Sequence, residues 1–190
     1  MDHESIGRLF QAAAKGDAAA WRSLVEALSP LVWSVVRAHG LSDADGHEAY
    51  QTTWFRLAQH LDRIREPERV STWLATTARN ECRKIIRSGR KLVVGEADTF
   101  DRIPDERTPE TVVIESEEAA AEAERHRRLW AAFQQLGDKC QRLLRVLMGS
   151  PPHSYQEAAA ALGLQIGSIG PMRQRCLRRL RVLMSEGGGP

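Results

Sequence analysis

Apolar side chains recur at helical spacing along most of the chain, and this periodicity limits the possible folds more than any other feature. Ile6, Leu9, Phe10 and Ala13 stand at positions i, i+3, i+4 and i+7, which is the stripe of an amphipathic helix. The same spacing returns in each later apolar segment, whereas the one short β-branched run, residues 92–94, is too short to form a strand. The sequence therefore predicts an all-α protein.

Several polar residues and glycines predict where helices begin and end. Asp17 precedes an apolar stripe and is expected to cap a helix. Ser154 and Glu157 have the spacing of a capping box, and Gly163 is expected to end that helix in the left-handed conformation. Pro30 fits either the first turn of a helix or a kink.

The net charge of +2 conceals an uneven distribution along the chain. Residues 1–95 carry 14 basic and 11 acidic side chains, residues 96–124 carry 2 and 11, and residues 125–190 carry 11 and 3. An acidic segment thus separates two basic ones, and the second basic segment is the stronger. This asymmetry points to a polyanionic partner.

Residues 92–124 differ from the rest in being acidic, poor in aromatic residues and interrupted by Pro104 and Pro109. Such a segment cannot bury enough apolar surface to offset the entropy of ordering, so we expect a flexible acidic linker. The Ala- and Glu-rich residues 112–124 are expected to join the helix that follows.

Cysteine usage and the N-terminus bear on location. No apolar run is long enough to span a membrane, and the acidic start lacks the pattern of a signal peptide, so we expect a cytoplasmic protein. Cys82, Cys140 and Cys176 are odd in number and far apart, so a disulfide framework is not expected, nor is a metal site. All three are expected to be buried as small apolar side chains.

The last two predicted helices form the strongest functional signal. A short helix ending at Gly163 is followed by an Arg-rich helix from about Ile166, which is the sequence form of a helix-turn-helix. If Ile169, Met172 and Cys176 face inward, the Arg side chains face outward, where they can meet bases and phosphates. The alternative is an ordinary solvated basic face.

These residues also carry a family resemblance. Residues 154–163 (SYQEAAAALG) and 167–181 (GSIGPMRQRCLRRLR) resemble region 4 of bacterial RNA polymerase sigma factors of the extracytoplasmic-function (ECF) group. Residues 45–48 (DGHE) and 51–57 (QTTWFRL) resemble the polymerase-docking helix of region 2, and residues 60–82 resemble its promoter-melting part. The resembling segments stand along the chain in the family's order.

The resemblance implies two small helical domains, a region 2 bundle and a region 4 helix-turn-helix, joined by the flexible acidic linker. Region 2 would span residues 1–91, the linker 92–124 and region 4 residues 125–184, with a tail at 185–190. In the family the linker enters the polymerase, where acidic side chains can mimic nucleic acid; a solvated tether is the alternative.

The resemblance also implies which residues meet core RNA polymerase, through its largest subunits. These candidates are Asp45, Glu48, Gln51, Trp54 and Phe55. Trp54 is at least as well explained as a core residue. Gly46 stands where the family usually has Ala, which weakens the helix by up to about 1 kcal/mol.

For the promoter −10 element, the family captures a flipped base in the loop at residues 62–69 and the helix that follows. The free-energy cost of flipping a base is offset by contacts in a close-fitting pocket. Binding of the single strand needs a positively charged groove. The candidates are Arg63, Arg65, Trp73, Asn80, Arg83, Lys84 and Arg87, within a basic run that continues to Arg90 and Lys91. Trp73 is more readily explained by packing beneath the loop than by stacking on a base.

For the −35 element, the family reads the major groove with the second helix of region 4. The candidates are Ser154, Tyr155, Ser168, Pro171, Gln174, Arg175, Arg178 and Arg179. Tyr155 is equally explained as partial core. Gly170 and Pro171 offer no side-chain donors, so DNA shape is expected to contribute to recognition.

The implied function is that of a transcription initiation factor, which binds core RNA polymerase, recognises −35 and −10 elements and assists promoter melting. An anti-sigma factor is a further possible partner. A stand-alone helix-turn-helix regulator is the alternative, but it leaves residues 45–57 unexplained. The six histidines are scattered and no phosphate-binding loop is present, so neither an enzymatic activity nor a cofactor is expected.

Overall fold

The computed structural model describes residues 3–89 and 117–186, and within these ranges every regular element is helical. The prediction of an all-α fold is confirmed. The elements are α1 (His3–Ala14), α2 (Ala18–Ala38), α3 (Asp43–Gln59), a 3₁₀ turn η1 (Pro67–Arg69), α4 (Val70–Gly89), α5 (Glu117–Gln134), α6 (Asp138–Leu147), α7 (Tyr155–Leu162) and α8 (Ile166–Glu186). None of these helices is both long and apolar enough to cross a membrane.

Local polar signals set several helix ends as the sequence predicts. The Asp17 carboxylate accepts hydrogen bonds from the backbone N–H groups of Ala19 and Ala20, which caps α2. Pro30 lies inside this helix, so the alternative that it begins a helix is wrong. Ser154 and Glu157 form the expected capping box of α7, and Gly163 ends α7 with φ +68°.

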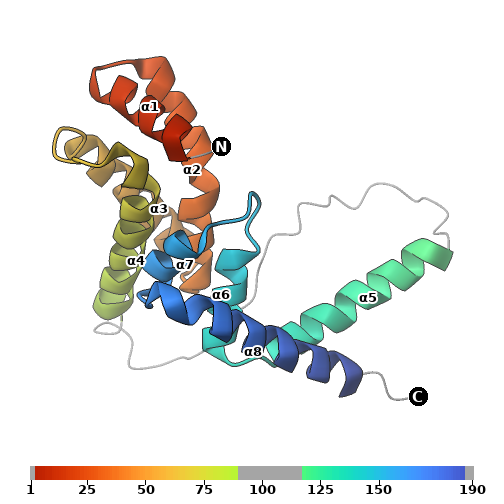
Figure 1. Cartoon of the computed structure of the whole chain (residues 1–190). Helices are drawn as coiled ribbons and strands as arrows, with labels where there is room; N and C mark the ends of the chain where they lie inside the picture. Colours follow the sequence, from red (N-terminus) through yellow and green to blue (C-terminus); the bar gives the residue numbers. More distant parts are fainter. Residues whose placement is uncertain (1–2, 90–116, 187–190) are drawn as a thin grey trace.

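Helices α1 to α4 pack around one apolar core. Its fully buried side chains include Leu24, Val32, Leu57 and Leu74, with Phe10 from α1 almost as deeply placed. Helix α4 lies against both α2 and α3 (Figure 1). This core fixes α4 so that its remaining face is available for function.

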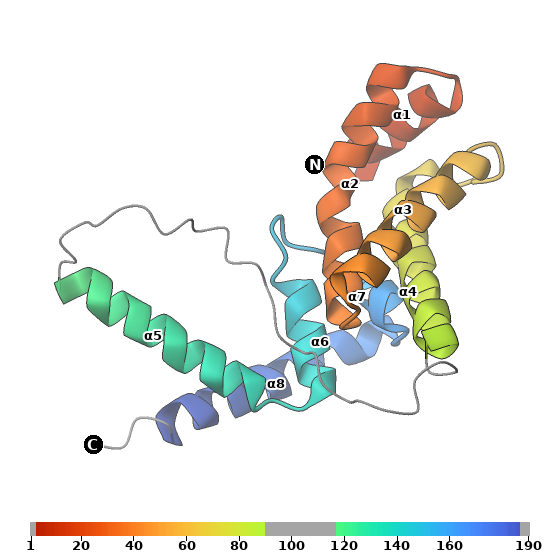
Figure 2. The same ribbon diagram turned by 180° about the vertical axis from the view of Figure 1, so that it is seen from behind.

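Helices α5 to α8 build a second, smaller core. Leu143 and Leu144 of α6, Ile169 and Cys176 of α8, and Leu136 after α5 meet there. The N-terminal part of α5 extends away from the other helices (Figures 1 and 2). Since α5 begins at residue 117, the described part of the predicted linker, residues 117–124, is helical, while residues 90–116 lie outside the described residues.

The two halves of the chain are in contact with each other. Helix α7 packs against α4, and α6 packs against α2, as both views of the fold show (Figures 1 and 2). Val146, Ala158 and Ala161 from the second half are buried in the same apolar cluster as Leu74 and Ala78 from the first. The division into a region 2 and a region 4 domain therefore stays a prediction, with the added finding that the two helical groups share buried surface.

Candidate nucleic-acid interface

The outward face of α4 is strongly basic. Arg83, Lys84 and Arg87 are exposed on it, while Ala78 and Cys82 of the same helix are fully buried. The Arg87 Nε group donates to the Arg83 carbonyl oxygen at 3.2 Å, which orients the guanidinium along the helix. Arg90 and Lys91, predicted to continue this run, lie outside the described residues.

The one acidic residue of this stretch points away from the basic face. Glu81 is buried, and its carboxylate lies 2.7 Å from the Arg56 Nε atom of α3. The pair joins α4 to α3 and neutralises the acidic charge inside the protein. Arg83, Lys84 and Arg87 therefore face solvent without an opposing carboxylate from Glu81.

Asn80, the sharpest −10 candidate, is exposed on α4 next to the contact between the two halves. Its Oδ1 atom accepts a hydrogen bond of 3.2 Å from Arg79. Arg79 also donates to the Ala160 carbonyl oxygen of α7 at 3.1 Å. One guanidinium thus links the predicted base-contacting residue to the helix-turn-helix half.

The loop before α4 presents two further charges and covers an aromatic side chain. Arg63 and Arg65 are exposed, as a groove for single-stranded DNA requires. Trp73 is half-buried, packs against the N-terminal core and has its ring 6.2 Å from that of His60. This placement favours the packing role of Trp73 over stacking on a base.

The docking candidates on α3 divide into exposed and buried side chains. Glu48 and Gln51 are exposed, Asp45 is half-exposed, and Phe55 is 63% exposed, unusually high for a large apolar side chain. Trp54 is only 7% exposed and meets the Trp21 ring edge-on at 6.2 Å. The burial of Trp54 favours the core alternative.

Gly46 is buried in α3 because α2 passes close to it. A Cβ atom at this position would lie 3.2 Å from the Val36 Cγ1 atom, which is a crowded contact. Beside it, Trp33 stacks on Tyr50 with ring centroids 4.6 Å apart and meets His47 edge-on. The sequence did not identify Trp33 as part of this surface, although an aromatic residue in the helix before the docking motif was a signal for it.

The helix-turn-helix forms as expected, with α8 as its second helix. Its candidate residues Pro171, Gln174, Arg175, Arg178 and Arg179 are all exposed. Ile169 and Cys176 are buried on the opposite face, as predicted, and Met172 is half-buried. The helix continues through Pro171.

The candidates at the helix starts are placed less openly. Ser154 is half-buried, and its hydroxyl serves the capping box. Ser168 is half-buried and donates to the Gln165 carbonyl oxygen at 2.7 Å. Tyr155 is 41% exposed, and its ring lies near Gly170, so it is both a partial packing residue and open to solvent.

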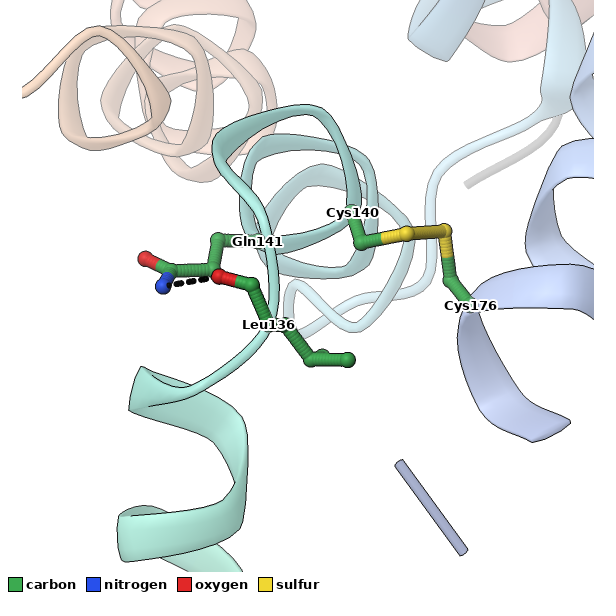
Figure 3. Close-up of a disulfide and its surroundings, with 4 residues drawn as sticks. All are labelled: Leu136, Cys140, Gln141 and Cys176. Carbon is green, nitrogen blue, oxygen red and sulfur yellow. Dashed lines mark hydrogen bonds between the residues drawn. A yellow bond between two sulfur atoms is a disulfide. The ribbon is translucent and has the colours of Figure 1, made fainter. Parts of the chain in front are cut away.

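The cysteines differ from expectation. Cys140 of α6 and Cys176 of α8 form a disulfide with a Cα–Cα distance of 5.3 Å (Figure 3), and only Cys82 is free. The prediction of three unpaired thiols is wrong because spacing along the chain does not reveal which helices pack together. Cys140 and Cys176 did lie on the inward stripes of two helices in one half, and this was the available signal. In the described parts of the chain, no group of His, Cys, Asp or Glu side chains is placed to hold a metal ion.

Charges from both halves converge at the end of α2. The Nδ1–H group of His39 donates a hydrogen bond of 2.8 Å to the Val35 carbonyl oxygen. Burial lowers the pKa of His39, and the nearby positive charges of Arg142, Arg79 and Arg83 lower it further. A protonated His39 would therefore add to an existing concentration of positive charge where α2, α4 and α6 meet.

The geometry defines an all-helical protein with a basic helix in one half and a helix-turn-helix in the other, and comparison with known proteins identifies the first half. Residues 24–92 match the model of the Sigma-70 region 2 family. The match agrees with the predicted resemblance to sigma factors over region 2. No curated protein matches the chain.

Two solved structures share the fold of almost the whole chain. The structure of CnrH in complex with the cytosolic domain of CnrY aligns with a TM-score of 0.60 and 21% identity, covering 96% of this chain and 98% of CnrH. The sigma factor RpoE in complex with the anti-sigma factor NepR, from Bartonella quintana, aligns with a TM-score of 0.59 and 18% identity, covering 86% of this chain and 96% of RpoE. The protein therefore has a sigma-factor fold that includes both halves.

Proposed function

We propose that this protein is a transcription initiation factor that binds core RNA polymerase and directs it to promoters through −10 and −35 contacts. The observation that carries the proposal is the combination of a Sigma-70 region 2 match over residues 24–92 with an exposed basic helix α4 inside it. A basic helix alone fits any polyanion. A basic helix in this domain fits the melted promoter strand.

Polymerase docking is assigned to the exposed side of α3. Phe55 offers a large apolar side chain, and Glu48 and Gln51 offer polar groups on the same helix. Exposed aromatic residues surrounded by polar ones are typical of protein interfaces. Trp54 is left out of this surface because it is buried.

Promoter contacts are divided between two helices. Asn80, Arg83, Lys84 and Arg87 on α4 would hold the −10 region, with Arg63 and Arg65 from the preceding loop. Gln174 and Arg175 on α8 would reach the −35 base edges, and Arg178 and Arg179 would meet phosphates. Pro171 would contribute shape contacts only.

An anti-sigma factor is the second proposed partner. Both similar solved structures are complexes with a protein partner, and in the RpoE structure the partner is described as an anti-sigma factor. In this chain the two halves already lie together, with Arg79 bonded to Ala160 across the contact. A partner that binds both halves at once would hold them in a fixed arrangement and block access of polymerase.

The deciding experiment is a pull-down with purified core RNA polymerase, followed by transcription in vitro from a promoter library. We expect the full chain to bind core polymerase and to select a subset of promoters. The matched variant Phe55→Ser changes an exposed side chain, so it should fold normally and lose most polymerase binding. Retention of DNA binding without any polymerase binding would instead support the stand-alone regulator.

A further inference from the structure

The disulfide ties together the two helices that frame the helix-turn-helix. Cys140 lies in the first turn of α6, and Cys176 lies near the middle of α8, 36 residues later (Figure 3). The enclosed segment contains the rest of α6, all of α7 and the first half of α8. The bond therefore constrains the relative position of every element of the helix-turn-helix.

Its position on α8 places it directly behind the predicted DNA contacts. Cys176 is 1% exposed, on the buried face, while Gln174, Arg175 and Arg178 are exposed on the same helical turns. A change in how α8 is held at Cys176 moves these neighbours, because they share one rigid helix. DNA binding by α8 is thus mechanically coupled to this bond.

The third cysteine is separated from this chemistry. Cys82 lies on α4, is fully buried and has no disulfide partner. Burial raises the pKa of its thiol to about 12, so it remains a protonated, unreactive thiol. Cys140, in contrast, is only partly buried, so it is the more accessible residue of the pair to a small oxidant or reductant.

The surroundings of the pair are able to hold α6 and α8 together when the bond is open. Leu143, Leu144, Ile169 and Leu183 form a buried apolar cluster around Cys176. The Gln141 side chain also donates to the Leu136 carbonyl oxygen at 2.8 Å, which fixes the turn before α6 (Figure 3). Opening the bond then loosens this half without removing its core.

We propose that Cys140 and Cys176 form a reversible thiol–disulfide modification site that sets the stability and DNA affinity of the helix-turn-helix half. The effect on DNA affinity rests on the proposed function, in which α8 contacts the promoter. A protein that works with RNA polymerase also meets a compartment that keeps thiols reduced. In such a compartment the disulfide forms only when an oxidant is present.

The chemistry requires a peroxide as oxidant and a dithiol as reductant. The more accessible Cys140 thiolate attacks a peroxide oxygen, which breaks the O–O bond and gives a sulfenic acid and, with hydrogen peroxide, one water. The Cys176 thiolate then attacks that sulfur, forms the S–S bond and releases the oxygen as a second water. A dithiol reverses the process by becoming a disulfide itself and returning two thiols to the protein.

The test compares the full chain after treatment with hydrogen peroxide and after treatment with a dithiol. Thiol titration of the denatured protein should find one thiol after oxidation and three after reduction, as expected for three cysteines with one pair. The oxidised protein should melt about 5–10 °C higher, because closing the loop restricts the unfolded chain. It should also bind a mixed-sequence duplex several-fold more tightly at low salt.

Two variants provide controls. Cys140→Ser changes a partly buried position and should abolish the difference between the two treatments in melting temperature and in DNA affinity. Cys82→Ala should keep both differences, and peptide mapping of the wild-type protein locates the bond should that variant fold poorly. Equal melting temperatures and DNA affinities for the oxidised and reduced wild type, or oxidation at Cys82, would overturn the proposal.

The outcome is separable from that of the proposed function. A protein that binds polymerase but never links Cys140 to Cys176 would remove the modification site alone. A protein that cycles between thiols and disulfide with a shifted melting temperature but never binds polymerase would keep the site and remove the sigma-factor role.

Discussion

The two halves of the chain hold their helices together by different means. Helices α1 to α4 rely on a large apolar core, in which Phe10, Leu24 and Leu74 are almost fully enclosed, and on the ion pair between the buried Glu81 and the partly exposed Arg56. Helices α5 to α8 enclose a smaller cluster and add a covalent link between α6 and α8. Small helical units bury too little apolar surface to be very stable, and a crosslink is one way to compensate.

The difference also concerns how each half presents charge. In the first half, the carboxylate of Glu81 is turned inward to Arg56, so the exposed face of α4 is uniformly basic. In the second half, α8 carries its arginines on one face and only apolar residues and Cys176 in the core. The first half therefore obtains its exposed basic face by pairing Glu81 with Arg56. The second half obtains its basic face by placing arginines on the exposed side of α8 and apolar residues in the core.

The largest expected change in the free energy of unfolding comes from a substitution in the core of the first half. Leu74→Ala removes a fully buried side chain at the point where α4 also meets α7. We expect a loss of about 3 kcal/mol in the free energy of unfolding, from the transfer and cavity terms together. Urea denaturation followed by circular dichroism measures it.

The matched substitution Leu143→Ala tests whether the crosslink makes the second half less dependent on its core. Its side chain is also fully buried. We expect its cost to be smaller with the disulfide intact than after reduction. Equal costs in both states would show that the bond does not compensate for apolar packing.

Substitution of one DNA-contacting residue in each half should separate their roles. Arg175→Ala on α8 should reduce −35-dependent transcription by roughly tenfold and leave polymerase binding intact, because the side chain is exposed and away from α3. Asn80→Ala on α4 should impair open-complex formation more than duplex binding. Footprinting with and without a premelted promoter measures both.

This division of roles would be contradicted if both variants impaired the same step of initiation. If Arg175→Ala leaves promoter use unchanged, α8 does not read the −35 element. If Asn80→Ala weakens duplex binding and opening equally, Asn80 does not hold a flipped base.

A smaller effect is expected at the contact between the halves. Arg79→Ala removes the hydrogen bond to the Ala160 carbonyl oxygen, which is worth about 1 kcal/mol. We expect the halves to separate more often, which small-angle X-ray scattering detects as a larger radius of gyration. Arg83→Ala, on the same helix but without a bond to α7, is the control and should leave the radius unchanged.

The same contact should respond to pH. The pKa of His39 is lowered in the folded protein, so the unfolded chain binds a proton more readily than the folded one. The stabilisation that comes from neutral His39 is therefore fully present above about pH 6.5, and it is lost as the pH falls from there through the lowered pKa of the folded protein. Thermal melts between pH 7.5 and pH 5 measure this loss, and His39→Gln should reduce it; an unchanged slope would assign the pH dependence to other groups.

The smallest effect is expected at Gly46. Alanine there gains up to about 1 kcal/mol of helix propensity, but its Cβ would crowd the Val36 side chain at 3.2 Å. The two terms oppose each other, so we expect Gly46→Ala to change the free energy of unfolding by less than about 0.5 kcal/mol. A loss well above this in urea denaturation would mean that Val36 cannot shift.

Features set by neighbouring residues were predictable from the sequence. The Asp17 cap, the Ser154–Glu157 capping box and the left-handed Gly163 depend on side chains within a few positions, and all are present. The exposure of the arginines on α8 follows from its apolar stripe in the same way.

Features that depend on distant packing were not predictable. The Cys140–Cys176 bond and the contact of Trp54 with Trp21 require knowing which helix faces which. The contact of α7 with α4 is of the same kind, since Ala158 and Ala161 look like any inner face of a helix until their neighbours are known. Apolar periodicity gives the direction of a side chain, not the identity of what it meets.

Gly163 has two separate reasons to be glycine. Its positive φ ends α7, and a Cβ atom there would come within 2.7 Å of the Arg79 guanidinium. Asparagine tolerates the first condition but would push Arg79 away from the Ala160 carbonyl oxygen. The turn of the helix-turn-helix thus also leaves the space into which Arg79 of the other half packs. A substitution that an isolated C-terminal fragment would tolerate carries a second penalty in the intact chain.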